Sequence, residues 1–237
     1  MRRDVRALVF DLDDTLIRSY EDLIVPLERE AARRMLAAQR AARGEADGQP
    51  EPPHLPSQHR LEELLLAFRR RNPSGLPELL AQQLPSLGRR AWQARDAVFQ
   101  RPSVSRLTRM PGTRRLLEEL RLNYRLFLLT HGEREFQVRK LEKCRLAGFF
   151  DAVRIVDSGC GKRQALMDLT RALRLDASEV AVIGNRLDLE IGIGRELGHP
   201  TVWMQYGEGC EMTAEATGVC PDHVVDELSQ LGPLLGF

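Results

Sequence analysis

The chain has 237 residues, of which 43% are hydrophobic and 29% are charged. This length and composition predict one or two globular domains with a sizeable core. The formal net charge of +1 argues against a globally basic protein that binds nucleic acid or a membrane surface. No apolar run approaches the ~18 residues needed to cross a bilayer, and the charged N-terminus lacks the apolar stretch of a signal peptide.

The four cysteines are scattered and lack the spacing of a metal site. They are Cys144, Cys160, Cys210 and Cys220. Together with the missing leader, this pattern predicts a protein of the reducing cytoplasm. The sequence shows no heptad seam, so the oligomeric state stays open.

An acidic cluster follows the first apolar run of the chain. Residues 7–10 (Ala-Leu-Val-Phe) predict a short buried strand. The strand is followed by Asp11-Leu12-Asp13-Asp14-Thr15. Asp11 and Asp13 are two residues apart, so their side chains lean to one side while the backbone is extended. Two carboxylates on one edge are costly unless a divalent cation or a reaction uses them.

Residues 18–105 predict an all-helical insert, because none of them shows convincing strand alternation. Apolar residues recur at helical spacing in the first part of the insert. They are Leu23, Leu27, Ala31, Met35 and Ala38. Further helical patterns cover residues 58–71, 76–84 and 87–100. Residues 44–57 contain four prolines and little that is apolar, which predicts a loop.

From residue 111 onward, predicted strands and helices alternate. The strands are expected at 126–129, 152–156, 180–183, 201–204 and 223–225. The helices are expected from an N-cap at Thr113 to about 123, then at 134–145, 162–174 and 188–197, and at the C-terminus. This alternation predicts an α/β fold with a parallel sheet and right-handed crossovers. We expect residues 1–17 and 106–237 to form this domain.

Polar residues follow several of these strands, and ligands of open α/β sheets bind at the carboxyl ends of the strands. Thr130 ends the strand at 126–129, and Lys162 begins a helix. Gly184-Asn185-Arg186-Leu187-Asp188-Leu189-Glu190 follows the strand at 180–183.

In their order along the chain, these motifs resemble those of the haloacid dehalogenase-like (HAD) hydrolase superfamily, of the phosphatase type. Asp11, Asp13 and Thr15 match its Asp-x-Asp-x-Thr motif, Thr130 its second motif and Lys162 its third. Residues 184–190 match the acidic fourth motif. The resemblance implies a Rossmann-like core and identifies residues 18–105 with the helical cap of the family.

The resemblance also implies catalytic roles. Asp11 would attack phosphorus and form an aspartyl-phosphate. Asp13 would protonate the leaving alcohol and then activate water. Thr130, the backbone around His131 and Gly132, and the Lys162 ammonium would bind phosphoryl oxygens. For the His131 side chain, substrate contact and a structural role both stay open.

The implied cofactor is Mg²⁺, which takes oxygen ligands in octahedral geometry. Its expected ligands are a side-chain oxygen of Asp11, the backbone carbonyl of Asp13, Asn185 and Asp188. Asn185 stands where most relatives have Asp, so it offers an oxygen without charge and we expect weaker metal binding. Either Asp188 or Glu190 would supply the missing anion, directly or through water; both would also suit the first turn of a helix.

We further expect the neighbouring carboxylate to raise the pKa of Asp13, while the metal keeps Asp11 ionised. The function predicted from the sequence is a Mg²⁺-dependent phosphoric-monoester hydrolase acting on a small phosphorylated metabolite. A phosphotransferase or phosphomutase on the same fold stays open. A 2-haloacid dehalogenase is disfavoured by Asp13, because halide leaves without a proton. A non-catalytic binding homologue is favoured only by Asn185.

Overall fold

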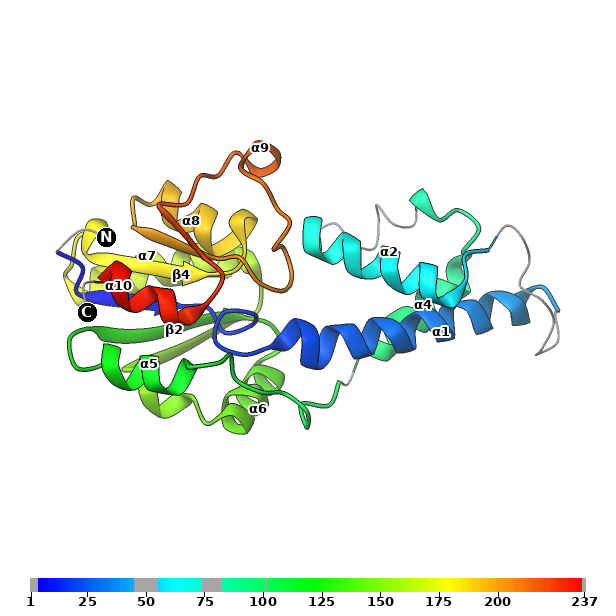
Figure 1. The fold of residues 1–237 in the computed structure, drawn as a ribbon, viewed down its shortest axis with the longest axis horizontal. Coiled ribbons are helices and arrows are strands. Elements are labelled where there is room, and N and C mark those ends of the chain that lie inside the picture. Colours follow the sequence, from blue (N-terminus) through cyan, green and yellow to red (C-terminus); the bar gives the residue numbers. More distant parts are fainter. Residues whose placement is uncertain (1–3, 45–54, 74–81, 101, 236–237) are drawn as a thin grey trace. The chain divides into compact units, whose positions relative to one another are not determined.

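The structure is a computed structural model that describes residues 4–44, 55–73, 82–100 and 102–235 (Figure 1). The chain divides into two compact units, Met1–Tyr20 with Val104–Phe237, and Glu21–Ser103. The first unit has an α/β architecture, and the described residues of the second are mainly helical. None of the described helices is both long enough and apolar enough to span a bilayer.

The α/β unit is built on a parallel sheet, which has six strands in the described part of the chain. Their order is β3-β2-β1-β4-β5-β6. The strands are β1 (Ala7–Phe10), β2 (Arg125–His131), β3 (Ala152–Val156), β4 (Val180–Gly184), β5 (Thr201–Met204) and β6 (His223–Val225). Phe10 of β1 pairs with Leu128 of β2 and with Ile183 of β4, so β1 lies inside the sheet. The predicted Rossmann-like α/β class is confirmed.

Helices cover both faces of this sheet, as Figure 1 shows. Leu8 and Phe10 share an apolar core with residues of α5 (Thr113–Leu120), α6 (Arg134–Cys144) and α10 (Leu231–Leu235). Ala7 and Val9 pack on the other face, with residues of α7 (Gly159–Leu173) and α8 (Gly192–Glu196). Strands that are buried on both faces need apolar residues at every position, so their sequences are continuous apolar runs.

Short helical turns connect these elements. They are η3 (Ala147–Phe149), η4 (Ala177–Glu179), η5 (Leu187–Ile191), α9 (Ala214–Thr217) and η6 (Leu228–Gln230). Two predicted helix starts were wrong. The helix expected at 162 begins at Gly159, and the one expected over 188–197 consists of the π-helical turn η5 followed by α8.

The prediction of Thr113 as an N-cap was also wrong. Gly112 holds that position with a left-handed φ of 76°, and Thr113 is the first residue of α5. The Thr113 hydroxyl lies 3.0 Å from the carbonyl oxygen of Leu16 and 2.7 Å from that of Met110. It therefore fixes the segment after β1 instead of capping the helix.

The second unit begins within the π-helical turn η1 (Tyr20–Ile24) and contains α1 (Val25–Ala42), α2 (Gln58–Arg71) and α4 (Arg89–Phe99). Its core is a cluster of aliphatic side chains that includes Met35, Leu61 and Leu65. Residues 76–81 of the helix expected over 76–84, and most of the loop expected over 44–57, lie outside the described residues.

A buried ion cluster links the three helices. The Glu28 carboxylate of α1 accepts hydrogen bonds at 2.5 Å from both Arg69 of α2 and Arg95 of α4. Both guanidinium groups also lie over the ring of Phe99.

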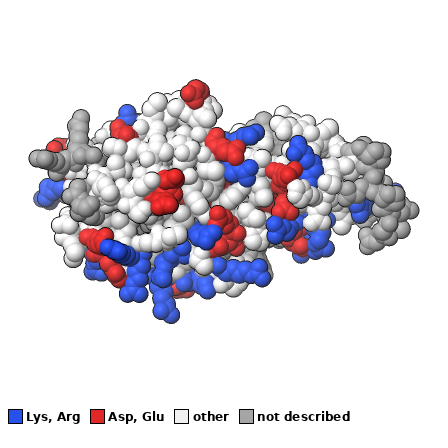
Figure 2. Space-filling view, in the orientation of Figure 1, with Lys and Arg blue, Asp and Glu red and all other residues white. Residues whose placement is uncertain are grey.

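At the surface, acidic and basic side chains are interspersed over the face drawn in Figure 2, in keeping with the formal net charge of +1.

Candidate active site

Asp11 lies at the carboxyl end of β1, immediately after Phe10. Its backbone N–H donates to the carbonyl of Ile183 at 2.9 Å, and only 6% of the residue is exposed. The Lys162 ammonium, from the first turn of α7, lies 2.6 Å from Oδ1 of Asp11. Thr130 is buried near the end of β2, two residues beyond the partner of Phe10. The structure thus brings the first and third motifs into direct contact.

Glu190 completes this cluster. Its Oε2 accepts a second hydrogen bond from Lys162 at 3.0 Å, and its Oε1 accepts one from the backbone N–H of Arg186 at 2.8 Å. Asp188 is exposed, and its carboxylate contacts the Arg186 guanidinium at 2.6 and 2.7 Å. Of the two acids left open by the sequence, Glu190 is therefore the one beside Lys162. The assignment of Asp188 to the metal stays a prediction.

Two buried carboxylates share one ammonium in this cluster. The pKa of Asp11 is raised to about 7, because burial and the charges of Glu190 and Asp13 raise it by more than Lys162 lowers it. Burial acts to lower the pKa of Lys162, but the two carboxylates raise it above its ordinary value. The cluster carries a net negative charge when ionised, which favours a bound cation beside Asp11.

Asp13 has a separate set of partners. The Lys140 ammonium of α6 contacts both of its oxygens, at 2.7 and 2.9 Å, and Nε2 of Gln137 donates to Oδ2 at 3.2 Å. The Ser19 hydroxyl donates to Oδ1. Burial acts to raise the pKa of Asp13, but the charge of Lys140 and these hydrogen bonds lower it below its ordinary value. The expected upward shift was wrong, because the Lys140 charge and these hydrogen bonds outweigh the effect of burial.

Asp14 is structural. It adopts a left-handed φ of 54°, and its carboxylate accepts hydrogen bonds from the backbone N–H groups of Tyr20 at 2.7 Å and Glu208 at 3.0 Å. A Cβ on Gly207 would lie 2.7 Å from Cβ of Asp14. Asp14 therefore joins the segment after β1 to the loop after β5.

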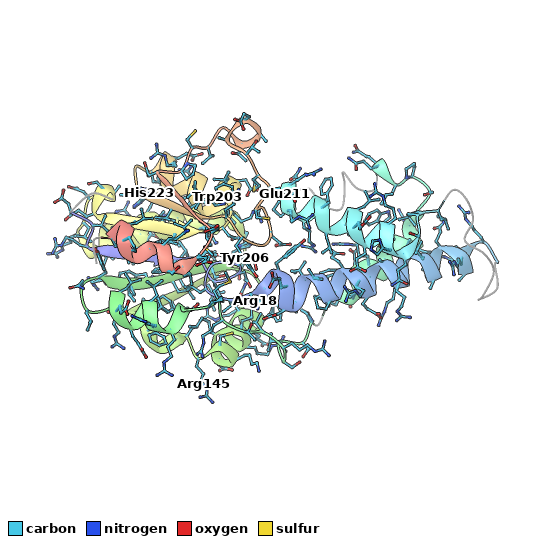
Figure 3. The ribbon with its side chains drawn as sticks, viewed as in Figure 1. Arg18, Arg145, Trp203, Tyr206, Glu211 and His223 are labelled. Carbon is cyan, nitrogen blue, oxygen red and sulfur yellow. The ribbon has the colours of Figure 1, made fainter. Side chains whose placement is uncertain are left out.

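Asn185 is held by the same loop. Its Nδ2 donates to the carbonyl of Glu208 at 2.9 Å and to that of Tyr206 at 3.5 Å. Its backbone carbonyl accepts from Nε1 of Trp203 at 2.9 Å; Figure 3 labels Trp203 and Tyr206 at and just after β5. Because the amide nitrogen is used by these carbonyls, the amide oxygen faces away from them.

The donor chemistry around Asp11 fits Mg²⁺ with few protein ligands. In the described ranges, no three His, Cys, Asp or Glu side chains gather as a metal-binding group. Mg²⁺ does not require such a group, since it keeps several waters and binds one or two carboxylates together with substrate phosphate. The Asp11 carboxylate, the Asp13 backbone carbonyl and the Asn185 amide oxygen are all oxygen donors of suitable chemistry.

His131 and Gly132 follow Thr130 at the end of β2. Burial and the positive charge of Lys162 lower the pKa of His131, so its imidazole is neutral at neutral pH. Gly132 has a φ of 135°, and a Cβ there would lie 2.8 Å from Nε2 of Gln137. A glycine is therefore required beside Gln137.

The partners of Asp13, which are Lys140, Gln137 and Ser19, were not predicted from the sequence. One signal was available in α6, where the buried positions are 137, 140, 141 and 144. This is the spacing of a helix face turned toward a core. Two polar residues at core positions indicate a buried polar contact.

Comparison with known proteins shows the family of the chain. A family model described as haloacid dehalogenase-like hydrolase matches residues 5–198. The chain belongs to this family. It is therefore a member of a hydrolase family. The segment that the family model matches includes the predicted motifs from Asp11 to Glu190.

Curated relatives of this HAD hydrolase are phosphatases by name. A glyceraldehyde 3-phosphate phosphatase of Pyrococcus furiosus is 26% identical over 98% of this chain and 92% of that protein. The corresponding enzyme of Pyrococcus abyssi is 33% identical, over 43% of this chain and 44% of that protein. N-acylneuraminate-9-phosphatase of Rattus norvegicus is 26% identical over 56% of this chain and 54% of that protein. The chain thus spans about half the length of two of these relatives and most of the third.

Solved structures share the fold. The HAD-hydrolase YfnB of Bacillus subtilis, with bound magnesium, matches with a TM-score of 0.60 and 18% identity over 98% of this chain and 99% of that one. A HAD phosphatase of Thermococcus onnurineus matches with a TM-score of 0.58 and 20% identity over 98% of both chains. At these identities the likeness concerns the fold of the HAD hydrolase and not its substrate.

Proposed function

We propose that this protein is a Mg²⁺-dependent phosphoric-monoester hydrolase that acts through an aspartyl-phosphate on Asp11. The observation that carries the proposal is the buried Asp11 carboxylate, 2.6 Å from the Lys162 ammonium, with Asp13 two residues away. Such a nucleophile is suited to phosphorus because the adjacent cation neutralises phosphoryl charge.

In the first half-reaction, a carboxylate oxygen of Asp11 forms a bond to phosphorus and the bond from phosphorus to the ester oxygen breaks. The leaving alkoxide takes a proton from the carboxyl group of Asp13, so an alcohol departs. Because Lys140 lowers the pKa of Asp13, this step draws on the fraction of the enzyme in which Asp13 is protonated. Lys162, the Thr130 hydroxyl and the backbone N–H groups after it bind the phosphoryl oxygens. The side-chain exposure of Asp13, 29%, supports its access to the leaving group.

In the second half-reaction, Asp13 as carboxylate takes a proton from a water molecule, whose oxygen attacks the phosphorus of the aspartyl-phosphate. The acyl-phosphate bond breaks, inorganic phosphate leaves and the Asp11 carboxylate is restored. The same group thus acts as acid and then as base.

Mg²⁺, when bound, supplies positive charge to the phosphoryl group and to Asp11. The Asp11 side chain, the Asp13 backbone carbonyl and the Asn185 amide oxygen would hold it. Glu190 would contribute through its contact with Lys162 and through water. The neutral Asn185 makes this set less anionic than one with a carboxylate at that position.

The proposed substrate is a small phosphorylated metabolite. The names of the relatives, which act on glyceraldehyde 3-phosphate and N-acylneuraminate 9-phosphate, support a phosphate on a primary alcohol. We assign its recognition to the helical unit Glu21–Ser103, as a cap, because the α/β unit holds the residues proposed for chemistry.

The test is phosphate release from a panel of esters, with and without Mg²⁺. The panel includes 4-nitrophenyl phosphate, glyceraldehyde 3-phosphate and sugar phosphates. Asp11→Asn should abolish release, whereas Asp168→Asn, an exposed acid of α7, should leave it unchanged. Release that is equal in wild type and Asp11→Asn would contradict the proposal.

The same panel separates the alternative reactions. A phosphotransferase would deliver phosphate to an added alcohol in preference to water. A dehalogenase would release halide from 2-haloacids with no need of Asp13 or Mg²⁺. A binding homologue would release nothing from any ester.

A further inference from the structure

We infer that Lys140 is a positioning residue that holds Asp13 for both proton transfers, with Gln137 as its support. This inference rests on the proposed function, because it concerns the acid and base of the same reaction. It adds a residue from α6 to a site otherwise built at the ends of β1, β2 and β4 and at the start of α7.

The contact is specific and closed from solvent on the lysine side. The Lys140 ammonium contacts both oxygens of Asp13 at 2.7 and 2.9 Å, and the exposed fractions of the two side chains are 6% and 29%. It also lies over the ring of Phe136, 4.6 Å from the centroid. A buried ammonium is costly unless it is paired, so the contact keeps Asp13 fixed although the Asp13 side chain is partly exposed.

Gln137 fixes the other half of the arrangement. Its Nε2 donates to the carbonyl of His131 at 2.6 Å and to Oδ2 of Asp13 at 3.2 Å. Its Oε1 is a buried acceptor with no hydrogen-bond partner among the described residues. An unsatisfied buried acceptor costs stability. The unpartnered Oε1 is in keeping with a Gln137 amide whose orientation is fixed by the two contacts of its Nε2.

The chemistry explains why a lysine suits this place. A carboxylate offers about four acceptor positions, and Lys140, Gln137 and Ser19 together make four contacts with Asp13. Proton transfer needs one position to be vacated. Since one ammonium contacts both oxygens, Lys140 can release one oxygen and keep the other, and Asp13 then stays in place while it exchanges a proton.

The structure also contains a matched control. The chain has three lysines, and Lys143 lies on the same helix as Lys140 but is exposed. A substitution of Lys143 removes the same charge from α6 without changing a contact of Asp13. General effects of net charge are thereby separated from the effect on Asp13.

The experiment compares two esters that differ in their need for an acid. An alkyl phosphate must release an alkoxide and needs the proton of Asp13, whereas 4-nitrophenyl phosphate releases a phenolate that leaves without one. kcat/KM reports the steps up to loss of the alcohol. For Lys140→Met we expect kcat/KM for the alkyl ester to fall roughly 10²-fold, a typical contribution of acid–base catalysis, and that for the aryl ester to fall far less. Lys143→Met should change neither.

Equal losses for the two esters, or no loss, would overturn the inference and leave the proposed function intact, because wild type would still hydrolyse both. Wild type that hydrolyses neither ester with Mg²⁺ would overturn the proposed function and the inference together. Circular dichroism and thermal unfolding establish that each variant is folded. If Lys140→Met does not fold, Lys140→Gln, which keeps a polar donor, should show the same selective loss.

Discussion

Gly184 and Glu190 are complementary in shape across the turn that follows β4. A Cβ on Gly184 would lie 2.6 Å from Oε1 of Glu190, closer than real Cβ contacts allow. The absent side chain lets Glu190 fold back toward the strand, where it accepts from the backbone of Arg186 and from Lys162. The glycine of the fourth motif thus makes room for the acid that pairs with the lysine of the third.

Gly184→Ala should therefore displace Glu190 and disturb Lys162. We expect a loss of about 1–3 kcal/mol in stability from overpacking and a fall in kcat/KM of up to about 10²-fold from misplacement of the catalytic groups. Phosphate release and urea unfolding measure the two effects. The matched control is Gly148→Ala, since an added Cβ there meets nothing within 4 Å. Full activity in Gly184→Ala would refute this role of the glycine.

Asn185→Asp tests whether the amide is retained for its hydrogen bonds. An Asp cannot donate to the carbonyls of Glu208 and Tyr206, so we expect a loss of about 1–3 kcal/mol in stability without metal. The added charge should also lower the Mg²⁺ concentration for half-maximal activity by tenfold or more, since a charge close to a cation is worth several kcal/mol at an effective dielectric near ~20. Thermal unfolding with and without Mg²⁺, and a Mg²⁺ titration of activity, provide the measurement. An unchanged Mg²⁺ requirement would argue against Asn185 as a metal ligand.

The strands could be predicted closely from the sequence because each is buried in a parallel sheet and reads as an apolar run. The ranges 152–156, 201–204 and 223–225 agree with β3, β5 and β6 residue for residue. Asp11, Thr130 and Lys162 could be selected as candidates for a similar reason, since each stands at a recognisable strand end or helix start.

The rest of the site depends on contacts between distant residues. Glu190 could not be separated from Asp188 because η5 is a π-helical turn, in which the usual 3.6-residue spacing does not hold. Lys140 lies 127 residues from Asp13, and on a highly charged helix it resembles a solvated lysine. Only its place on the buried face of α6, at helical spacing with Leu141 and Cys144, distinguishes it from one.

Glu28→Gln should destabilise the helical unit strongly. The substitution removes the carboxylate that Arg69 and Arg95 share, and breaking a buried ion pair from one side costs about 3–5 kcal/mol. The matched control on the same helix is Glu30→Gln, which removes exposed pairs with Arg33 and Arg34 worth at most about 1 kcal/mol. Urea unfolding followed by circular dichroism compares the two. Equal losses would mean that the buried cluster contributes no more than a surface pair.

His199 should make stability depend on pH. It is buried, and its Nδ1 lies 2.9 Å from the carbonyl oxygen of Val180. Burial lowers its pKa below the ordinary 6.5, although the hydrogen bonds with backbone carbonyls act to raise it. Between the lowered value and 6.5 the unfolded chain binds more protons than the folded one, so protonation favours unfolding.

The contribution of His199 to stability is therefore fully present above pH 6.5 and declines as the pH falls toward the lowered pKa. Asp11, whose pKa is raised, acts in the opposite direction, so the comparison must be made between variants. The difference in urea midpoint between wild type and His199→Gln, measured from pH 8 to pH 5, should shrink as the pH falls, because only wild type has the histidine to protonate. A difference that is constant with pH would mean that His199 has the same pKa in the folded and unfolded chains.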